Sequence, residues 1–165
     1  MTSRAQAALL VAVIAAAGGL WLWRSSATPE QRAIRDRFER FAAEFNAGTT
    51  DGLGTMARAA RIGEYFTEDV VVELGQGSPP IHGRETLIGM STRLQPRTAA
   101  FVLEFSDVTV DLLDAAHAEV TFTLVIRRRS ESGAESLDAR EFAVDMRKAG
   151  GDWRVSRAIA IDTLR

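Results

Sequence analysis

Residues 66–85 read FTEDVVVELGQGSPPIHGRE, and this stretch is the most informative about the fold. Its run VVVEL at residues 70–74 is rich in β-branched side chains and predicts a strand. The following GQGSPP predicts a loop, because glycine and proline interrupt regular structure. Ile81 and His82 then predict a short return strand, and Gly83-Arg84-Glu85 predicts the start of a helix that runs to about residue 94.

Four longer strands are expected after this stretch, at residues 99–112, 116–128, 136–148 and 153–164. The second alternates, with these apolar residues on one face: Ala118, Val120, Phe122, Leu124 and Ile126. The third places Phe142, Val144 and Met146 on one face in the same way. Residues 130–135 and 149–152 contain glycine and predict hairpin connections.

Helices are expected before residues 66–85. Thr28 is a suitable N-cap with Pro29 at the first helical position, and Asn46-Ala47-Gly48 ends the helix. Between them, apolar residues recur at helical spacing and predict a core-facing stripe: Ile34, Phe38, Phe41, Ala42 and Phe45. A short second helix is predicted at residues 50–60, with a further turn at 62–66. Helices followed by a run of strands indicate an α+β fold.

The N-terminal residues 5–23 read AQAALLVAVIAAAGGLWLW and carry no charge. A helix of this length spans about 28 Å, close to the thickness of the bilayer core. We therefore expect one transmembrane anchor in residues 1–24, a linker at 25–29 and a domain at 30–165. A cleaved signal peptide is the alternative, since Ala15-Ala16-Ala17 could serve a peptidase. The short leader favours a single-pass membrane protein whose domain is exported, although the arginines after the run favour the opposite orientation.

Composition excludes several classes of site. The chain has no cysteine, so it has neither disulfides nor thiolate metal sites. Its formal net charge of −2 argues against nucleic-acid binding, which depends on phosphate neutralisation. The two histidines, His82 and His117, lie far apart without a ligand-spaced carboxylate pattern, so no metal and no cofactor are expected.

Four short motifs occur in a distinctive order: Asn46-Ala47-Gly48, Phe66 with Glu68-Asp69, His82-Gly83-Arg84-Glu85, and Gly151-Asp152-Trp153-Arg154-Val155. Together they resemble the nuclear transport factor 2-like superfamily, which includes ketosteroid isomerases and SnoaL-like cyclases. The resemblance implies a cone of helices on a curved mixed or antiparallel sheet, with a pocket at its open end. It also implies that a ligand would contact Phe41, Phe45, Tyr65, Phe66, Leu74, His82 and Phe142.

The resemblance does not extend to isomerase chemistry. The position of the catalytic carboxylate falls on Leu74, and that of the enolate-binding tyrosine falls on Phe41. The third position, a protonated acid, falls on Phe142 or Ala143. None of these side chains can move a proton or stabilise an oxyanion. An isomerase mechanism of that kind is therefore not expected.

Two functions remain open at this point. The first is a membrane-tethered, non-catalytic domain that binds a small hydrophobic molecule or a protein partner. The second is a SnoaL-like enzyme in which His82 acts as a base oriented by Asp69 or Glu73. The lack of a convincing acid–base pair favours the first. The resemblance also implies a homodimer that pairs through the open face of the sheet.

Overall fold

The computed structural model describes residues 27–47, 52–75, 77–93, 100–129 and 135–161. The chain divides into two compact units, Met1–Arg32 and Ala33–Arg165. The apolar run at residues 5–23 lies outside the described residues, so the predicted anchor stays a prediction. Of the helices that are described, none is both long and apolar enough to cross a membrane.

Helix α2 spans Pro29–Asn46, as the sequence predicts. Thr28 and Gln31 cap its start reciprocally: the Gln31 amide donates to Thr28 Oγ1 at 3.2 Å, and the Thr28 amide donates to Gln31 Oε1 at 2.9 Å. Ile34 and Phe38 are the buried residues of its apolar stripe. The helix therefore presents that stripe to the core of the second unit.

The segment after α2 differs from the prediction at its boundaries. Helix α3 spans Gly52–Gly63 and strand β1 spans Phe66–Glu73, so the turn expected at residues 62–66 is present but shorter, closed by the Tyr65 amide donating to the Ile62 carbonyl at 3.2 Å. Strand β1 begins before its β-branched run because Phe66 pairs with Val155. Strand β2 at Ile81–His82 and helix α4 at Arg84–Arg93 lie where they were predicted.

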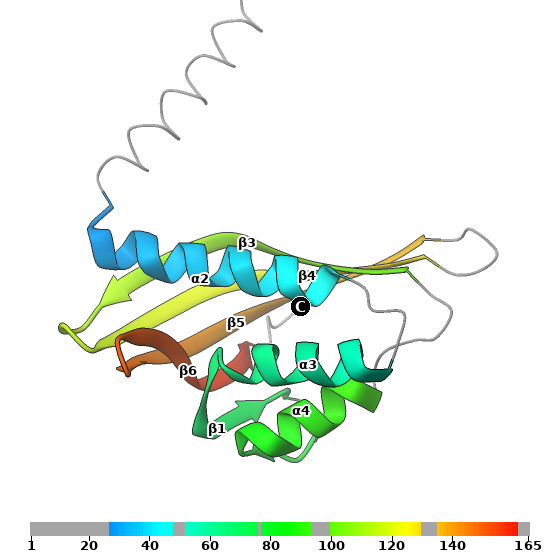
Figure 1. Cartoon of the computed structure of the whole chain (residues 1–165). Coiled ribbons are helices and arrows are strands. Elements are labelled where there is room, and N and C mark those ends of the chain that lie inside the picture. Colours follow the sequence, from blue (N-terminus) through cyan, green and yellow to red (C-terminus); the bar gives the residue numbers. More distant parts are fainter. Residues whose placement is uncertain (1–26, 48–51, 76, 94–99, 130–134, 162–165) are drawn as a thin grey trace, which may run out of the picture. The chain divides into compact units, whose positions relative to one another are not determined.

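The four long strands are β3 at Ala100–Leu112, β4 at His117–Arg129, β5 at Glu135–Ala149 and β6 at Asp152–Ile161. With β1 and β2 they form one six-stranded sheet in the order β2-β1-β6-β5-β4-β3 (Figure 1). All neighbours pair antiparallel except β1 and β6, which pair in parallel. The second unit is therefore an α+β fold with a mixed sheet, and the predicted cone-like architecture is confirmed.

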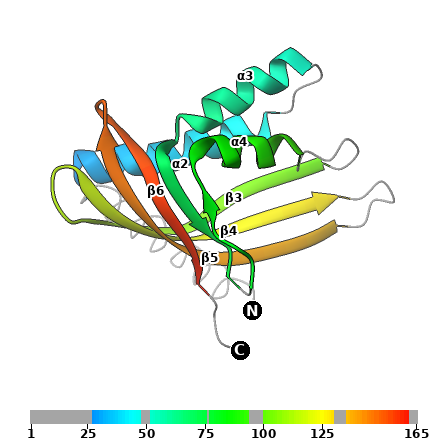
Figure 2. The same ribbon diagram turned by 90° about the horizontal axis from the view of Figure 1, so that it is seen from below.

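The sheet curves strongly, and Figure 2 shows the long strands wrapping around the helices. Irregularities in pairing accompany this curvature. In β3 the pairing shifts between Ser106 and Thr109, and Asp107 has a φ of 54°. One extra residue on a strand bends it and increases its twist. A second shift lies between Asp145 and Met146 in the pairing of β5 with β6.

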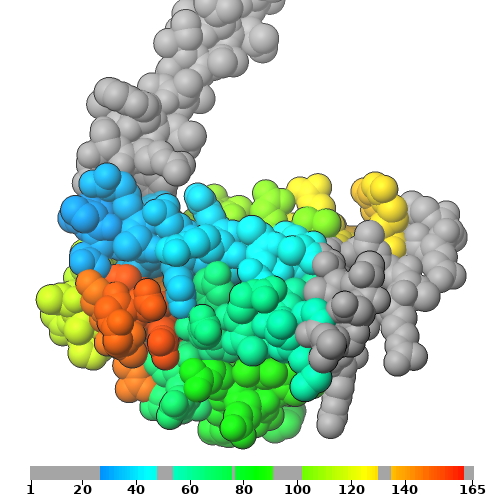
Figure 3. All heavy atoms as spheres, viewed as in Figure 1, coloured from blue at the N-terminus to red at the C-terminus, as the bar shows by residue number. Residues whose placement is uncertain are grey.

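One face of the sheet carries the core. Six of the eight predicted inward residues of β4 and β5 are buried there, namely Ala118, Val120, Phe122, Phe142, Val144 and Met146, while Leu124 and Ile126 are half-buried. Helix α2 packs on this face through Phe38, whose ring lies 5.1 Å from that of Phe105 and 5.0 Å from that of Phe122. The space-filling view shows α2, α3 and α4 side by side on one side of the molecule (Figure 3).

Helices α3 and α4 approach closely at Gly63. A Cβ atom there would lie 2.5 Å from Ile88 Cδ1, which is closer than real Cβ contacts allow. The absence of a side chain at this position therefore lets Ile88 of α4 pack against the end of α3. This contact fixes the pair of helices beside β1.

Candidate ligand-binding cavity

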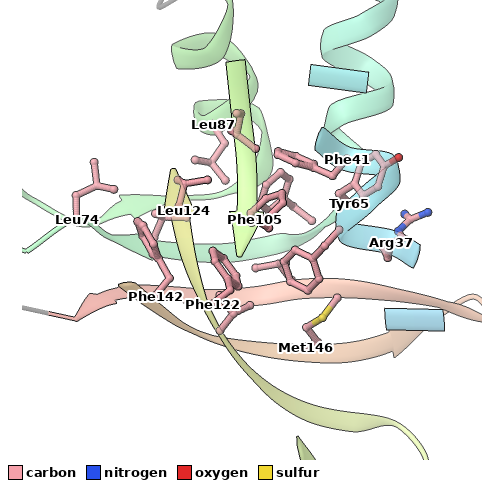
Figure 4. Close-up of a pocket in the computed structure, with 16 residues that line it drawn as sticks. Arg37, Phe41, Tyr65, Leu74, Leu87, Phe105, Phe122, Leu124, Phe142 and Met146 are labelled. Carbon is pink, nitrogen blue, oxygen red and sulfur yellow. The ribbon is translucent and has the colours of Figure 1, made fainter. Parts of the chain in front are cut away.

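A cavity of about 230 Å³ lies between α2 and the core face of the sheet. Figure 4 shows its lining residues, which come from α2, α4 and five of the six strands, with Tyr65 from the turn before β1. They are Arg37, Phe38, Phe41, Tyr65, Phe66, Val72, Leu74, Leu87, Leu103, Phe105, Phe122, Leu124, Phe142, Val144, Met146 and Val155. The volume exceeds the roughly 150 Å³ of a dry engineered cavity that binds benzene.

Aromatic rings form much of the wall. Phe105 and Phe122 meet edge to face with ring centroids 4.9 Å apart, and Phe122 stacks on Phe142 at 5.8 Å. On the helix side, Phe41 meets Tyr65 at 5.2 Å and Phe66 at 5.8 Å, both edge to face. Ring pairs in these geometries stabilise one another beyond the area they bury. The wall is thus built from interlocked rings that hold the cavity open.

Polar side chains are confined to Arg37 and Tyr65 among the lining residues. The guanidinium of Arg37 lies 4.2 Å from the centre of the Tyr65 ring, and its Nη2 donates a 2.8 Å hydrogen bond to the Glu64 carbonyl. The wall exposes no nitrogen or oxygen atom to the cavity, so Arg37 contributes its aliphatic stem. In this conformation the cavity favours apolar surface.

Five of the seven residues that the sequence assigned to a ligand site line this cavity: Phe41, Tyr65, Phe66, Leu74 and Phe142. Phe45 and His82 are not among the lining residues. Phe45 lies one turn beyond Phe41 on α2 and stacks on it at 6.1 Å. His82 is exposed on β2, opposite Val71 of β1.

The positions that correspond to the three isomerase groups do come together. Phe41, Leu74 and Phe142 surround the same cavity, so the sequence correspondence is spatially consistent. Ala143, the alternative third position, is not a lining residue; neighbours on a strand point to opposite faces. All three lining side chains are hydrocarbons, which cannot exchange a proton.

The carboxylates that the enzyme hypothesis needs lie elsewhere. Asp69 is exposed and pairs with Arg147, whose hydrogen bond lowers the pKa of the Asp69 carboxyl below its ordinary value. Glu73 accepts a 2.7 Å hydrogen bond from Arg157 Nη2. Neither carboxylate lines the cavity, and neither has a hydrogen bond to His82 among the described contacts. The structure does not bring His82 and Asp69 together in the cavity.

Metal binding has no visible support in the described part of the chain, where no group of three His, Asp or Glu side chains could hold an ion. The other histidine, His117, is exposed at the start of β4 and contacts Asp114 at 2.9 Å. The aspartate also accepts hydrogen bonds from the amides of Ala116 and His117. This pair therefore stabilises the β3–β4 turn.

Sequence reasoning missed several lining residues. Arg37 was not among the residues assigned to the apolar stripe, although it lies four residues before Phe41 and so shares that face. Leu103 and Phe105 could have been found from their alternation in β3. Leu87 gave no signal, because its place depends on how α4 packs.

A comparison with protein-family models matches residues 30–159 to the SnoaL-like domain. The chain belongs to this family. The SnoaL-like domain is part of the nuclear transport factor 2-like superfamily, so the family expected from the four motifs is confirmed. The family has both ligand-binding and enzymatic members. A search of curated proteins found no match.

Solved structures share the fold of this SnoaL-like domain at low sequence identity. A nuclear transport factor 2-like protein with a cystatin-like fold from Novosphingobium aromaticivorans is 17% identical with a TM-score of 0.64, covering 90% of this chain and 89% of its own. A protein provisionally described as a scytalone dehydratase from the same species is 16% identical with a TM-score of 0.65, covering 82% and 85%. A ketosteroid isomerase-like protein from Erwinia carotovora atroseptica is 17% identical with a TM-score of 0.58, covering 81% and 96%.

Proposed function

We propose that this SnoaL-like domain binds a small hydrophobic molecule in its cavity and does not catalyse a reaction on it. The observation that carries the proposal is the apolar wall: the lining residues include no carboxylate and no histidine. An apolar cavity with few polar groups is typical of small-molecule sites. Acid–base catalysis needs a titratable group within hydrogen-bond reach of the substrate, and the wall offers none near neutral pH.

The volume of the cavity limits the size of the apolar body that it can hold. Because about 150 Å³ accommodates benzene, about 230 Å³ suits a body of roughly two fused rings or an aliphatic chain of similar bulk. A protein partner is the other occupant that the sequence left open. The small volume and the aromatic wall support a small molecule in preference to a peptide segment.

The test uses two neighbouring residues of β4 that point to opposite faces. Leu124 lines the cavity and Val125 does not. The full-length chain is purified gently, and native mass spectrometry reports any molecule that remains bound. We expect Leu124→Trp to fill the cavity and lose the bound mass, while Val125→Arg keeps it. Equal retention by both variants would contradict binding in this cavity.

The enzyme alternative is tested separately. A SnoaL-like enzyme that used His82 with Asp69 would lose turnover on His82→Ala. We expect no conversion of a β,γ-unsaturated ketosteroid by the unmodified chain, measured by the absorbance of the conjugated product. Turnover that disappears in His82→Ala would overturn the non-catalytic proposal.

We also propose that residues 5–23 tether the exported domain to a membrane as a single-pass anchor, because their uncharged length suits a bilayer. We expect the full chain to sediment with membranes and to resist carbonate extraction. A soluble mature chain beginning near Gly18 would instead indicate a cleaved signal peptide.

We also propose that two chains form a homodimer through the sheet face opposite the cavity. That face includes the exposed apolar residues Val102 and Leu137, which flank Arg127 in the register. Val125 lies on the same face as Arg127, next to Glu104 of β3. We expect Val125→Arg to shift the chain from dimer to monomer in sedimentation velocity while Leu124→Trp does not. A monomeric unmodified chain at high micromolar concentration would contradict the dimer.

A further inference from the structure

We propose that the ligand of this cavity is an amphipathic anion whose acidic group pairs with Arg37 while its apolar body fills the cavity. The inference rests on the proposed function, because it names the chemical class of the molecule bound at the same site. Its starting point is the charge of Arg37, which the apolar wall leaves unexplained.

Arg37 differs in its charge balance from six of the fourteen other arginines that the structure describes. Six others each have a carboxylate within 4 Å: Arg61 with Glu44, Arg84 with Glu68, Arg127 with Glu104, Arg129 with Glu135, Arg147 with Asp69 and Arg157 with Glu73. For Arg37, the described residues supply a backbone carbonyl and an aromatic face but no carboxylate. A guanidinium carries a permanent positive charge and five donors. Among the described residues, no carboxylate therefore neutralises the charge on Arg37.

The hydrogen bonding of Arg37 is incomplete as well. Its Nη2 donates to the Glu64 carbonyl at 2.8 Å, but its Nε is buried and has no acceptor. A buried donor without an acceptor destabilises the folded state. A ligand oxygen that reached this group would supply both the missing acceptor and the missing negative charge.

The position of Arg37 gives the ligand a direction. Figure 4 shows Arg37 and Tyr65 together at one side of the cavity, with Leu74 at the far side. An anionic group at the Arg37 side therefore leaves the apolar body to lie among Phe105, Phe122 and Phe142.

The guanidinium must turn to meet such a group, because the wall exposes no nitrogen atom in this conformation. One hydrogen bond to a carbonyl and one stacking contact hold it on Tyr65. No ion pair would have to break. A carboxylate can then accept two parallel hydrogen bonds from the guanidinium, a geometry specific to arginine.

The experiment compares two probes of the same shape, 2-naphthoate and its uncharged analogue 2-naphthamide. Both are titrated into the full-length chain at pH 7 by isothermal calorimetry. We expect 2-naphthoate to bind at least about 10-fold more tightly, the factor typical of a hydrogen bond to a charged group. We expect Arg37→Met to abolish that preference while leaving naphthamide binding within about 3-fold, since the apolar wall is intact.

The matched control is Arg40→Met, which removes an exposed arginine of the same helix that bonds to the Asp36 carbonyl and does not line the cavity. It should keep the full preference. If Arg37→Met does not fold, Arg37→Gln replaces it, because glutamine keeps a donor for the Glu64 carbonyl without the charge.

The outcomes separate the two proposals. Equal binding of both probes by the unmodified chain would overturn the anionic ligand and leave the hydrophobic cavity function standing. A preference that survives in both Arg37 variants would overturn the role of Arg37. Binding of neither probe would overturn the cavity function and this inference with it.

Discussion

Side chains around the cavity carry no acid or base at the positions where isomerases of the superfamily use them. Phe41, Leu74 and Phe142 lie around one space, as the sequence correspondence requires, but they offer it only hydrocarbon. The reactivity of such a site depends on several groups acting together, so restoring one of them is not sufficient.

Leu74→Asp tests this point directly. We expect no measurable isomerisation of a β,γ-unsaturated ketosteroid, because the new carboxylate has no partner to stabilise the enolate. We also expect a loss of about 1–3 kcal/mol in the free energy of unfolding, the cost of placing a polar group against an apolar wall. Urea unfolding and product absorbance measure the two effects. Clear turnover by Leu74→Asp would show that Phe41 and Phe142 do not limit catalysis.

Asp69 provides a test by pH. Its pKa is lowered chiefly by the hydrogen bond from Arg147, so the ion pair stabilises the fold above the ordinary carboxyl value of 3.8 and is lost as the pH falls below it. We expect Asp69→Asn to melt at a lower temperature than the unmodified chain at pH 6. The difference between the two melting temperatures should shrink as the pH falls below 3.8 and vanish once the pH is below the lowered pKa of Asp69. A difference that is unchanged at pH 3 would show that the ion pair is not its source.

At the scale of elements, a few contacts position the helices on the sheet. Asn46, the last residue of α2, acts as a strand partner for β3: its Nδ2 donates to the Leu103 carbonyl and its Oδ1 accepts from the Leu103 amide, both at 2.8 Å. This pair of bonds ties the end of α2 to the edge strand. Leu103 itself lines the cavity, so the same contact fixes part of the wall.

Asn46→Ala should therefore destabilise the domain by about 1–2 kcal/mol, the loss of two net hydrogen bonds. Asn46→Asp should lose at least as much, because its carboxylate keeps the acceptor but repels the Leu103 carbonyl. Chemical denaturation of both variants measures the effect. If Asn46→Asp is as stable as the unmodified chain, the donor half of the contact is not important.

The contact between α3 and α4 predicts that a second substitution restores part of the stability lost by the first. Gly63→Ala should cost about 0.5–1.5 kcal/mol, because the added Cβ meets Ile88 Cδ1 and that side chain must leave its preferred rotamer. Ile88→Val removes that carbon, so the double variant Gly63→Ala/Ile88→Val should be more stable than the sum of the single changes predicts. The interaction energy of this double-mutant cycle measures the clash. Additive losses would mean that the helices separate instead.

Much of the element order followed from the sequence, because alternation in β4 and β5 and the Phe stripe of α2 are strong periodic signals. Five of the seven residues assigned to a ligand site also line the cavity. The differences from the structure have physical causes. The start of β1 depends on pairing with β6 and leaves no local pattern. The irregularity at Asp107 appears in the sequence only as a change of the apolar residues from odd to even positions. Phe45 and His82 were placed by resemblance, and a rotation of less than one helical turn or one strand position is enough to move a side chain out of a cavity.

For the molecule as a whole, the second unit has its own core. Fifteen of the buried apolar residues form one cluster, which includes residues of α2 and of every strand except β2, and several of them line the cavity. The described residues of the first unit contribute none of the buried apolar side chains.

A chain that begins at Thr28 should therefore fold without the preceding residues, and it keeps the Thr28–Gln31 cap. We expect cooperative thermal unfolding by circular dichroism and dispersed amide signals by NMR. The unmodified chain in detergent is the comparison. An expanded state that binds hydrophobic dyes and unfolds without a transition would contradict an independent domain.

The extra residue at Asp107 changes which residues of β3 face inward. Before it, the odd-numbered Leu103 and Phe105 face the cavity; after it, the even-numbered Val108, Val110 and Leu112 pack on the core. Deleting one residue there would remove the bulge and leave Val108, Val110 and Leu112 facing inward in a regular strand, whereas a deletion farther along the strand would turn the residues beyond it to the opposite face. A relative without the bulge should therefore be one residue shorter in this segment, and an alignment that places no gap there would superimpose inward residues on outward ones.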